Sequence, residues 1–259
     1  MIMEFIDFYA SAVSFFFSLL ILWSGTGAGL LVIPVLITLF NTDPVVAIAS
    51  GSMFAFISKI LMTLGHSQQG NVDWRLVYLF LRICLPVTLV NAASLAYLSE
   101  SEPNISLEFY LITGILLAGC LALAAMLSDG IKVILAKWPL SSMSASTGIL
   151  MGLTGVGGGV LVVPALATKG GLTIKTAVAT SIPIGLILSL TVSLTLGSRG
   201  LVDYQLVTSL LVGTVIAIPI GLRLFHIFSE NVITRVTCIL ISLGLVGLAI
   251  KATNLASHL

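Results

Sequence analysis

Long apolar runs, interrupted by short polar or glycine-rich stretches, make up almost the whole chain. Six runs are close to or above the length of about 20 residues that a helix needs to cross the hydrocarbon core of a bilayer. Their ranges are 45–64, 74–98, 105–127, 173–196, 203–224 and 231–251. Backbone groups in lipid need partners within the chain, so we predict that all six runs are membrane-spanning helices.

A glycine-rich stretch occurs twice, once before each group of three long runs. Residues 25–36 read GTGAGLLVIPVL, and residues 155–166 read GVGGGVLVVPAL. The two stretches align without a gap at an offset of 130 residues (155 minus 25), and the match continues to about residue 77 of the first copy. We therefore interpret the chain as a duplicated unit with one glycine-rich break in each half.

Each break divides a shorter apolar region into two arms, because glycine leaves the backbone unrestrained and interrupts a helix. The arm after the first break, residues 28–40, would be only about 20 Å long as a helix. This is too short to cross a core of about 30 Å. We predict one hairpin at about 11–40 and a second at about 141–168, whose second arm covers 158–168.

The predicted fold is an all-α integral membrane protein with two repeats, each made of a hairpin and three spans. The first repeat covers 1–127, a cytoplasmic connector covers 128–140, and the second repeat covers 141–259. Composition agrees, because 58% of residues are hydrophobic and 8% are charged, whereas about a quarter are charged in soluble proteins. The net charge of +1 gives no indication of a nucleic-acid partner.

Two topologies are compatible with this pattern. If each hairpin enters and leaves the membrane on one side, the halves are inverted; if each broken segment crosses, they are parallel. Under the re-entrant topology one face receives nine basic residues and the other receives Arg199 and Lys251. The nine are Lys59, Arg75, Arg82, Lys132, Lys137, Lys169, Lys175, Arg223 and Arg235. The crossing topology gives seven against four. The positive-inside rule favours the re-entrant topology, with both termini non-cytoplasmic.

The two breaks are the candidate binding site. Irregular backbone within a membrane is tolerated where it is buried or lines a wet cavity, and inverted-repeat transporters bind their substrates at such breaks. The N-terminal ends of the arms at 28 and 158 would present unpaired N–H groups and the positive end of the helix dipole. The candidate residues are Ser24, Gly25, Thr26, Gly27, Ala28, Thr154, Gly155, Gly157, Gly158 and Gly159.

Other polar side chains are weaker candidates. Ser50, Ser52, Thr180 and Ser181 could line the cavity or bond to their own helix backbone. Arg82 could compensate the charge of an anion or extend to the cytoplasmic face, and Lys59 is interpreted as extending in this way. Asp73 and Asp203 are interpreted as N-caps. The glycines themselves could instead serve only close helix packing.

The chemistry of the site favours an anion. No Asp or Glu lies in the middle of any predicted span, although cation sites and proton relays in membranes usually need one. The three cysteines are single and show no metal-ligand or disulfide pattern. We expect no cofactor, no metal and no enzymatic activity, since neither a paired nucleophile and base nor two intramembrane acids are present.

The doubled motif at 25–36 and 155–166 resembles the signature of the TauE/SafE sulfite exporter family of bacterial membrane proteins. The resemblance extends over nearly the whole chain and implies a multi-pass inner-membrane transporter of sulfite, organosulfonates or other sulfur-containing anions. Ala28 stands where the second copy has glycine.

Several functional alternatives stay open. These are an anion channel, a permease for another oxyanion or a carboxylate, and a subunit that only supports a partner. The expected partners are a small anionic solute and the lipid bilayer, with no nucleic acid; a homodimer is allowed.

Overall fold

The computed structural model describes residues 8–24, 27–68, 70–99, 105–128, 137–156, 159, 161–224 and 230–256. These ranges contain only helices and the turns that join them. In the first half the helices are α1 (Phe8–Ser24), α2 (Ala28–Thr38), α3 (Pro44–Gln68), α4 (Trp74–Leu98) and α5 (Ile105–Leu127). In the second half they are α7 (Leu140–Thr154), α8 (Val162–Lys169), α9 (Ile174–Gly197), α10 (Tyr204–Leu224) and α11 (Glu230–Ala256).

Six of the described helices are long and apolar enough to cross a membrane: α3, α4, α5, α9, α10 and α11. They correspond to the six predicted spans, and α4 and α5 have the predicted bounds. The expectation of an all-helical integral membrane protein is confirmed. α3 and α11 continue beyond the predicted ends at 64 and 251, to Gln68 and Ala256, because a helix need not stop where its hydrophobicity does.

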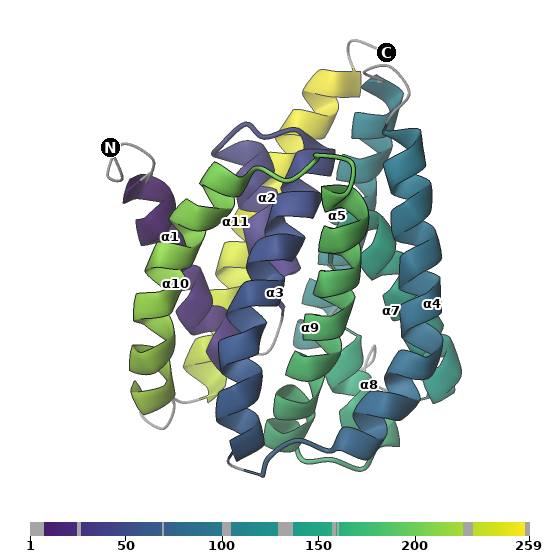
Figure 1. Ribbon diagram of the computed structural model, residues 1–259, viewed down its shortest axis with the longest axis vertical. Coiled ribbons are helices and arrows are strands. Elements are labelled where there is room, and N and C mark those ends of the chain that lie inside the picture. Colours follow the sequence, from purple (N-terminus) through teal and green to yellow (C-terminus); the bar gives the residue numbers. More distant parts are fainter. Residues whose placement is uncertain are drawn as a thin grey trace.

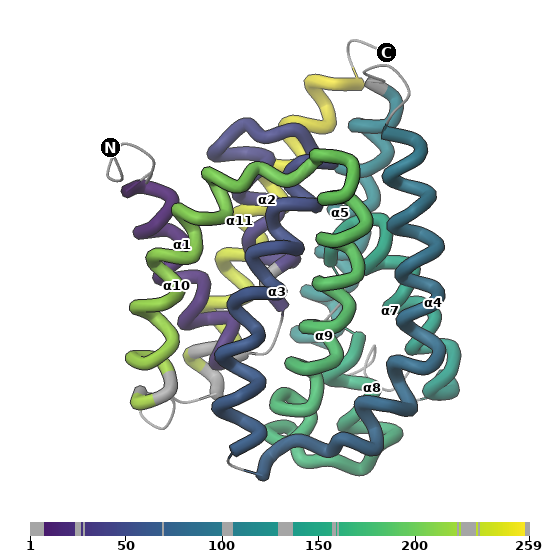
Figure 2. The backbone as a smooth tube through the Cα atoms, viewed as in Figure 1, coloured from purple at the N-terminus to yellow at the C-terminus, as the bar shows by residue number. Residues whose placement is uncertain are grey.

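The central helices are α3 and α9, which pack along each other and are the most buried of the six long helices. Figure 1 shows them side by side and running in opposite directions, since the turn from α3 to α4 lies at the lower end and the turn from α9 to α10 at the upper end. Figure 2 shows the same course of the backbone, with the start of α1 and the end of α11 both toward the upper end.

Each short first arm packs against a long helix of the other half. α1 lies along α10, and α7 lies along α4. Between α1 and α10, the Ser18 and Thr214 hydroxyls are hydrogen-bonded at 2.7 Å, and Trp23 Nε1 donates to the Gly221 carbonyl at 2.9 Å. Such polar contacts hold helices together where lipid offers no hydrophobic drive to associate.

The α7–α4 contact depends on small residues instead. A Cβ added at Gly148 would meet the Cys84 carbonyl oxygen at 2.7 Å, and one at Gly152 would meet the Thr88 carbonyl oxygen at 2.7 Å. These two glycines, four residues apart, let the helix backbones approach closely, as in small-xxx-small packing. The packing interpretation of glycine therefore applies to this pair.

Candidate functional site

The first break joins α1 to α2. α2 begins at Ala28, as predicted, after Gly27, whose φ of 87° favours glycine. Gly27 has no side chain that could cap this helix start, so among the described residues no side chain neutralises the first N–H groups of α2 or the positive end of its dipole. Gly25 and Thr26, and the side chains of Ser24 and Ala28, lie outside the described residues.

In the second break, residues 154–156 form hydrogen bonds with one another and with the end of α7. Gly155, with φ 65°, ends α7 and donates its N–H to the Met151 carbonyl at 3.0 Å. Thr154 Oγ1 donates to the Leu150 carbonyl at 2.6 Å and accepts the N–H of Val156 at 3.2 Å. The Thr154 hydroxyl was expected to serve an anion, but in this structure it stabilises the turn.

The helix after the second break starts later than predicted. α8 begins at Val162, whereas a start at residue 158 was expected, and that expectation is wrong. Gly159 is buried in a turn, and its carbonyl accepts the N–H of Val163 at 3.3 Å. Consecutive glycines add no side-chain restraint to hold a helical turn. Gly157 and Gly158 lie outside the described residues.

The two breaks touch each other. A Cβ built on Gly29, in the first turn of α2, would collide with the carbonyl group of Gly155 and lie 3.3 Å from Cα of Val156. Gly29 is buried. The start of α2 and the end of α7, which belong to different halves, therefore meet backbone against backbone in the interior.

Ser52, from α3, lies at this meeting point. A Cβ on Gly155 would meet Ser52 Oγ at 3.3 Å, Ile48 Cγ2 at 3.3 Å and Ile33 Cδ1 at 2.6 Å. The Ser52 side chain is 1% exposed, and its hydroxyl has no hydrogen-bond partner in the described part of the chain. Of the four weaker hydroxyl candidates, Ser52 is the one that these contacts place at the breaks.

The other three hydroxyls have protein partners. Ser50 Oγ accepts the N–H of Asp203 at 2.8 Å, and Thr180 Oγ1 accepts the N–H of Asp73 at 3.0 Å. These are the same bond made twice, because 50 plus 130 is 180 and 73 plus 130 is 203. Ser181 donates to the Val178 carbonyl of its own helix at 2.7 Å.

Asp73 and Asp203 are N-caps, as predicted. Their carboxylates accept the N–H groups of Leu76 at 3.0 Å and Leu206 at 2.9 Å. Sequence reasoning missed that their own N–H groups bind hydroxyls of the other half. The sequence did contain a signal for these bonds, because the two Asp residues and the two hydroxyl residues are each separated by the same 130 residues.

The two basic candidates lie in different environments. The Arg82 side chain is exposed on α4. Lys59 does not extend out: its side chain is 5% exposed, and Nζ donates to Ser189 Oγ on α9 at 3.3 Å. The interpretation that Lys59 extends to the cytoplasmic face from a span end is wrong, because α3 continues two further turns to Gln68 and the side chain is buried against α9.

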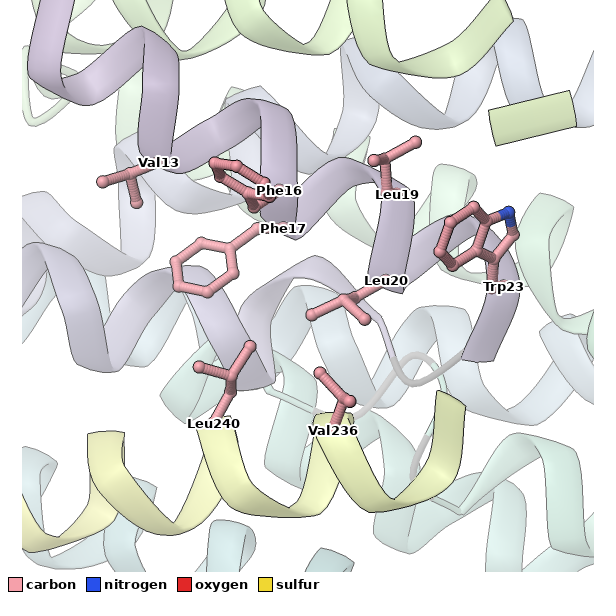
Figure 3. Close-up of a pocket in the computed structure, with 8 residues that line it drawn as sticks. All are labelled: Val13, Phe16, Phe17, Leu19, Leu20, Trp23, Val236 and Leu240. Atoms are coloured by element: carbon pink, nitrogen blue, oxygen red, sulfur yellow. The ribbon is translucent and has the colours of Figure 1, made fainter. Parts of the chain in front are cut away.

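The groove shown in Figure 3 lies between α1 and α11 and has a volume of about 410 Å³. Apolar side chains line it, among them Phe16, Phe17, Leu20, Val236 and Leu240, together with Trp23, whose N–H is bonded to the Gly221 carbonyl. Such a lining suits a lipid chain, and it has no free hydrogen-bond donor or positive charge for an anion. Among the described residues, no three His, Cys, Asp or Glu side chains are grouped to hold a metal ion.

This arrangement of buried polar breaks within six long apolar helices defines a multi-pass membrane protein. The model of the family described as Sulfite exporter TauE/SafE matches residues 10–249, nearly the whole chain. The chain therefore belongs to the TauE/SafE sulfite exporter family, a family of membrane transporters. No curated protein and no solved structure matches it.

Proposed function

We propose that this protein moves a small sulfur-containing oxyanion, sulfite or an organosulfonate, across the cell inner membrane by alternating access. The observation that carries the proposal is the contact of Gly29 with Gly155 and Val156. It brings the start of α2 against the irregular backbone that follows α7, inside a bundle of apolar helices, and inverted-repeat transporters hold their substrates at such places. The start of α2, which Gly27 does not cap with a side chain, supports a negatively charged solute.

The proposed architecture is a pair of inverted repeats, 1–127 and 141–259, each with a re-entrant hairpin. Two observations support it. α3 and α9 occupy equivalent places in the repeats and run antiparallel (Figure 1). The bonds of Ser50 to Asp203 and of Thr180 to Asp73 are equivalent under the same offset, as two halves related by a two-fold axis require.

The proposed orientation places both termini outside the cytoplasm. The turn that precedes Arg75 lies at the lower end of Figure 1, and the turn that contains Arg199 lies at the upper end. The lower end, where α4 and α9 begin and α8 ends, carries Arg75, Lys169 and Lys175. Basic residues mark the cytoplasmic face.

Transport is tested with the purified protein in liposomes loaded with unlabelled sulfite. Radiolabelled sulfite added outside should accumulate transiently by counterflow, and protein-free liposomes should show none. Thiosulfate and taurine, tested in the same way, define the substrate class. Absence of counterflow with all three solutes would contradict the proposal, and voltage-dependent single-channel currents in planar bilayers would show a channel instead.

A further inference from the structure

One face of α3 carries a line of polar side chains. Ser52, Lys59 and Thr63 are separated by seven and four residues, which places them within about 40° of one another around the helix axis. The line is about 16 Å long. Ser52 marks its start beside Gly155, and His66, also buried, follows toward the end of α3.

Ser52 and Lys59 are buried, and Thr63 is half-buried with its hydroxyl oxygen turned inward. Within the described part of the chain, Ser52 Oγ and Thr63 Oγ1 are buried atoms without a hydrogen-bond partner. The Lys59 ammonium group has three N–H donors, and in the same part of the chain its one hydrogen bond is to Ser189. Ser189 donates its own proton to the Gly185 carbonyl at 2.6 Å, so two ammonium donors remain available.

The charge of Lys59 has no carboxylate on the helices that surround it most closely. α3 packs mainly against α9, α2, α10 and α5. α2, α3, α9 and α10 contain no Asp or Glu. The carboxylate of α5, Glu108, is in the first turn of that helix and lies beside Asp43 and Lys251. A buried cation normally pairs with an anion, and ionisable groups inside membrane bundles usually mark a solute pathway.

Lys59 also lies between the two halves. Its partner Ser189 is the equivalent residue of the second copy, since 59 plus 130 is 189, and the two residues meet where α3 crosses α9. A group at this place contacts both halves when they move relative to each other. A solute bound here can be reached from one side or the other as the halves tilt.

We propose that Lys59 is the anion-binding cation of the transport site, and that Ser52 and Thr63 donate hydrogen bonds to the anion as it passes along α3 on one side or the other of Lys59. This inference rests on the proposed function. It extends the site from the glycine breaks along α3. The ligand class is a small oxyanion, whose negative oxygens accept from the two remaining ammonium N–H groups and, along the path, from the hydroxyls.

The test compares four proteins: wild type, Lys59→Met, Ser189→Ala and Lys251→Met. Methionine keeps most of the side-chain volume but removes charge and donors. Lys251 is a matched control, because its ammonium group binds the Ile37 carbonyl and Asn41 Oδ1, each at 3.0 Å. Sulfite counterflow gives the half-saturating concentration, and thermal unfolding in detergent with and without sulfite reports binding independently of transport.

We expect Lys59→Met to raise the half-saturating concentration by about 10-fold to 100-fold, the usual effect of losing a charged hydrogen bond. Its thermal shift with sulfite should disappear. Lys251→Met should keep a half-saturating concentration close to that of wild type. Ser189→Ala removes the partner of the ammonium group but leaves its charge and donors, so it should change this concentration less than Lys59→Met does. A purely structural role of Lys59 would instead lower the unfolding temperature of Lys59→Met and Ser189→Ala alike and leave the sulfite shift intact in both.

The outcomes separate this inference from the proposed function. If wild type transports sulfite and Lys59→Met does so with unchanged half-saturation, the role of Lys59 is refuted while transport stands. If wild type moves none of the anions, the proposed function itself fails. Should Lys59→Met not fold, Ser52→Ala and Thr63→Val decide: a several-fold rise in half-saturation supports the path, and unchanged values in both refute it.

Discussion

Gly29 brings the backbones of the two breaks into direct contact. Because the atoms opposite it belong to the Gly155 backbone, they cannot rotate away as a side chain would. We predict that Gly29→Leu separates the breaks, abolishes sulfite counterflow and costs about 1–3 kcal/mol of stability. Thermal unfolding in detergent and counterflow measure the two effects.

Gly114→Ala is the control for this prediction, because a Cβ there would make only an ordinary contact of 3.5 Å with Thr154 Cγ2. It should retain transport and stability. Wild-type transport by a folded Gly29→Leu protein would show that the contact between the breaks is dispensable.

The sequence predicted some roles of individual residues at the site and missed others. The N-caps at Asp73 and Asp203 followed from local sequence alone, because a cap acts within one turn of its own helix. The partners of Ser50, Thr180 and Lys59 did not, because they lie on other helices. Which way a hydroxyl or ammonium group points depends on how helices pack, and a single sequence does not state this.

At the scale of helices, the paired bonds of Ser50 to Asp203 and of Thr180 to Asp73 tie α3 to the start of α10 and α9 to the start of α4. We predict that Ser50→Ala and Thr180→Val each cost about 0.5–1.5 kcal/mol, because each leaves a backbone N–H without its acceptor. The two losses should add, since the bonds lie at opposite ends of the bundle. Thermal unfolding of the single and double variants measures them.

Ser181→Ala is the matched control for the helix pairing. Ser181 is adjacent to Thr180, but its hydroxyl bonds only within α9, so its loss should have a smaller effect. Equal destabilisation by Ser181→Ala and Thr180→Val would contradict a specific role for the bonds between helices.

Helix existence was predictable from sequence because the constraint is strong: an apolar run in lipid has to satisfy its backbone internally. The six long helices follow from this. The start of α8 at Val162 could not be predicted in the same way, because nothing in a run of glycines marks the residue at which a helix begins. Glycine permits many conformations, and the surrounding helices select one.

At the scale of the whole molecule, the antiparallel course of α3 and α9 has a measurable consequence for topology. We predict that Arg75→Cys and Ser198→Cys, in a background without the native cysteines, face opposite sides of the membrane. Both side chains are exposed, and they lie near turns at opposite ends of the bundle. A membrane-impermeant maleimide should label Ser198→Cys in intact cells and Arg75→Cys only after permeabilisation.

Labelling of both positions from the same side would contradict the inverted topology and favour a parallel duplication, in which each broken segment crosses the membrane. The number of basic residues on each face favours one topology only through the positive-inside rule, which is a statistical tendency. The labelling experiment distinguishes them directly.

The contact of Lys59 with Ser189 has one more consequence, which concerns stoichiometry. The two residues are equivalent positions of the duplicated unit and lie within hydrogen-bond distance of each other. If both were lysine, two like charges would meet at this place and repel each other. With serine in the second copy, the interior holds one cation there and neutralises one negative charge. Calorimetric titration should therefore saturate at a single anion per polypeptide.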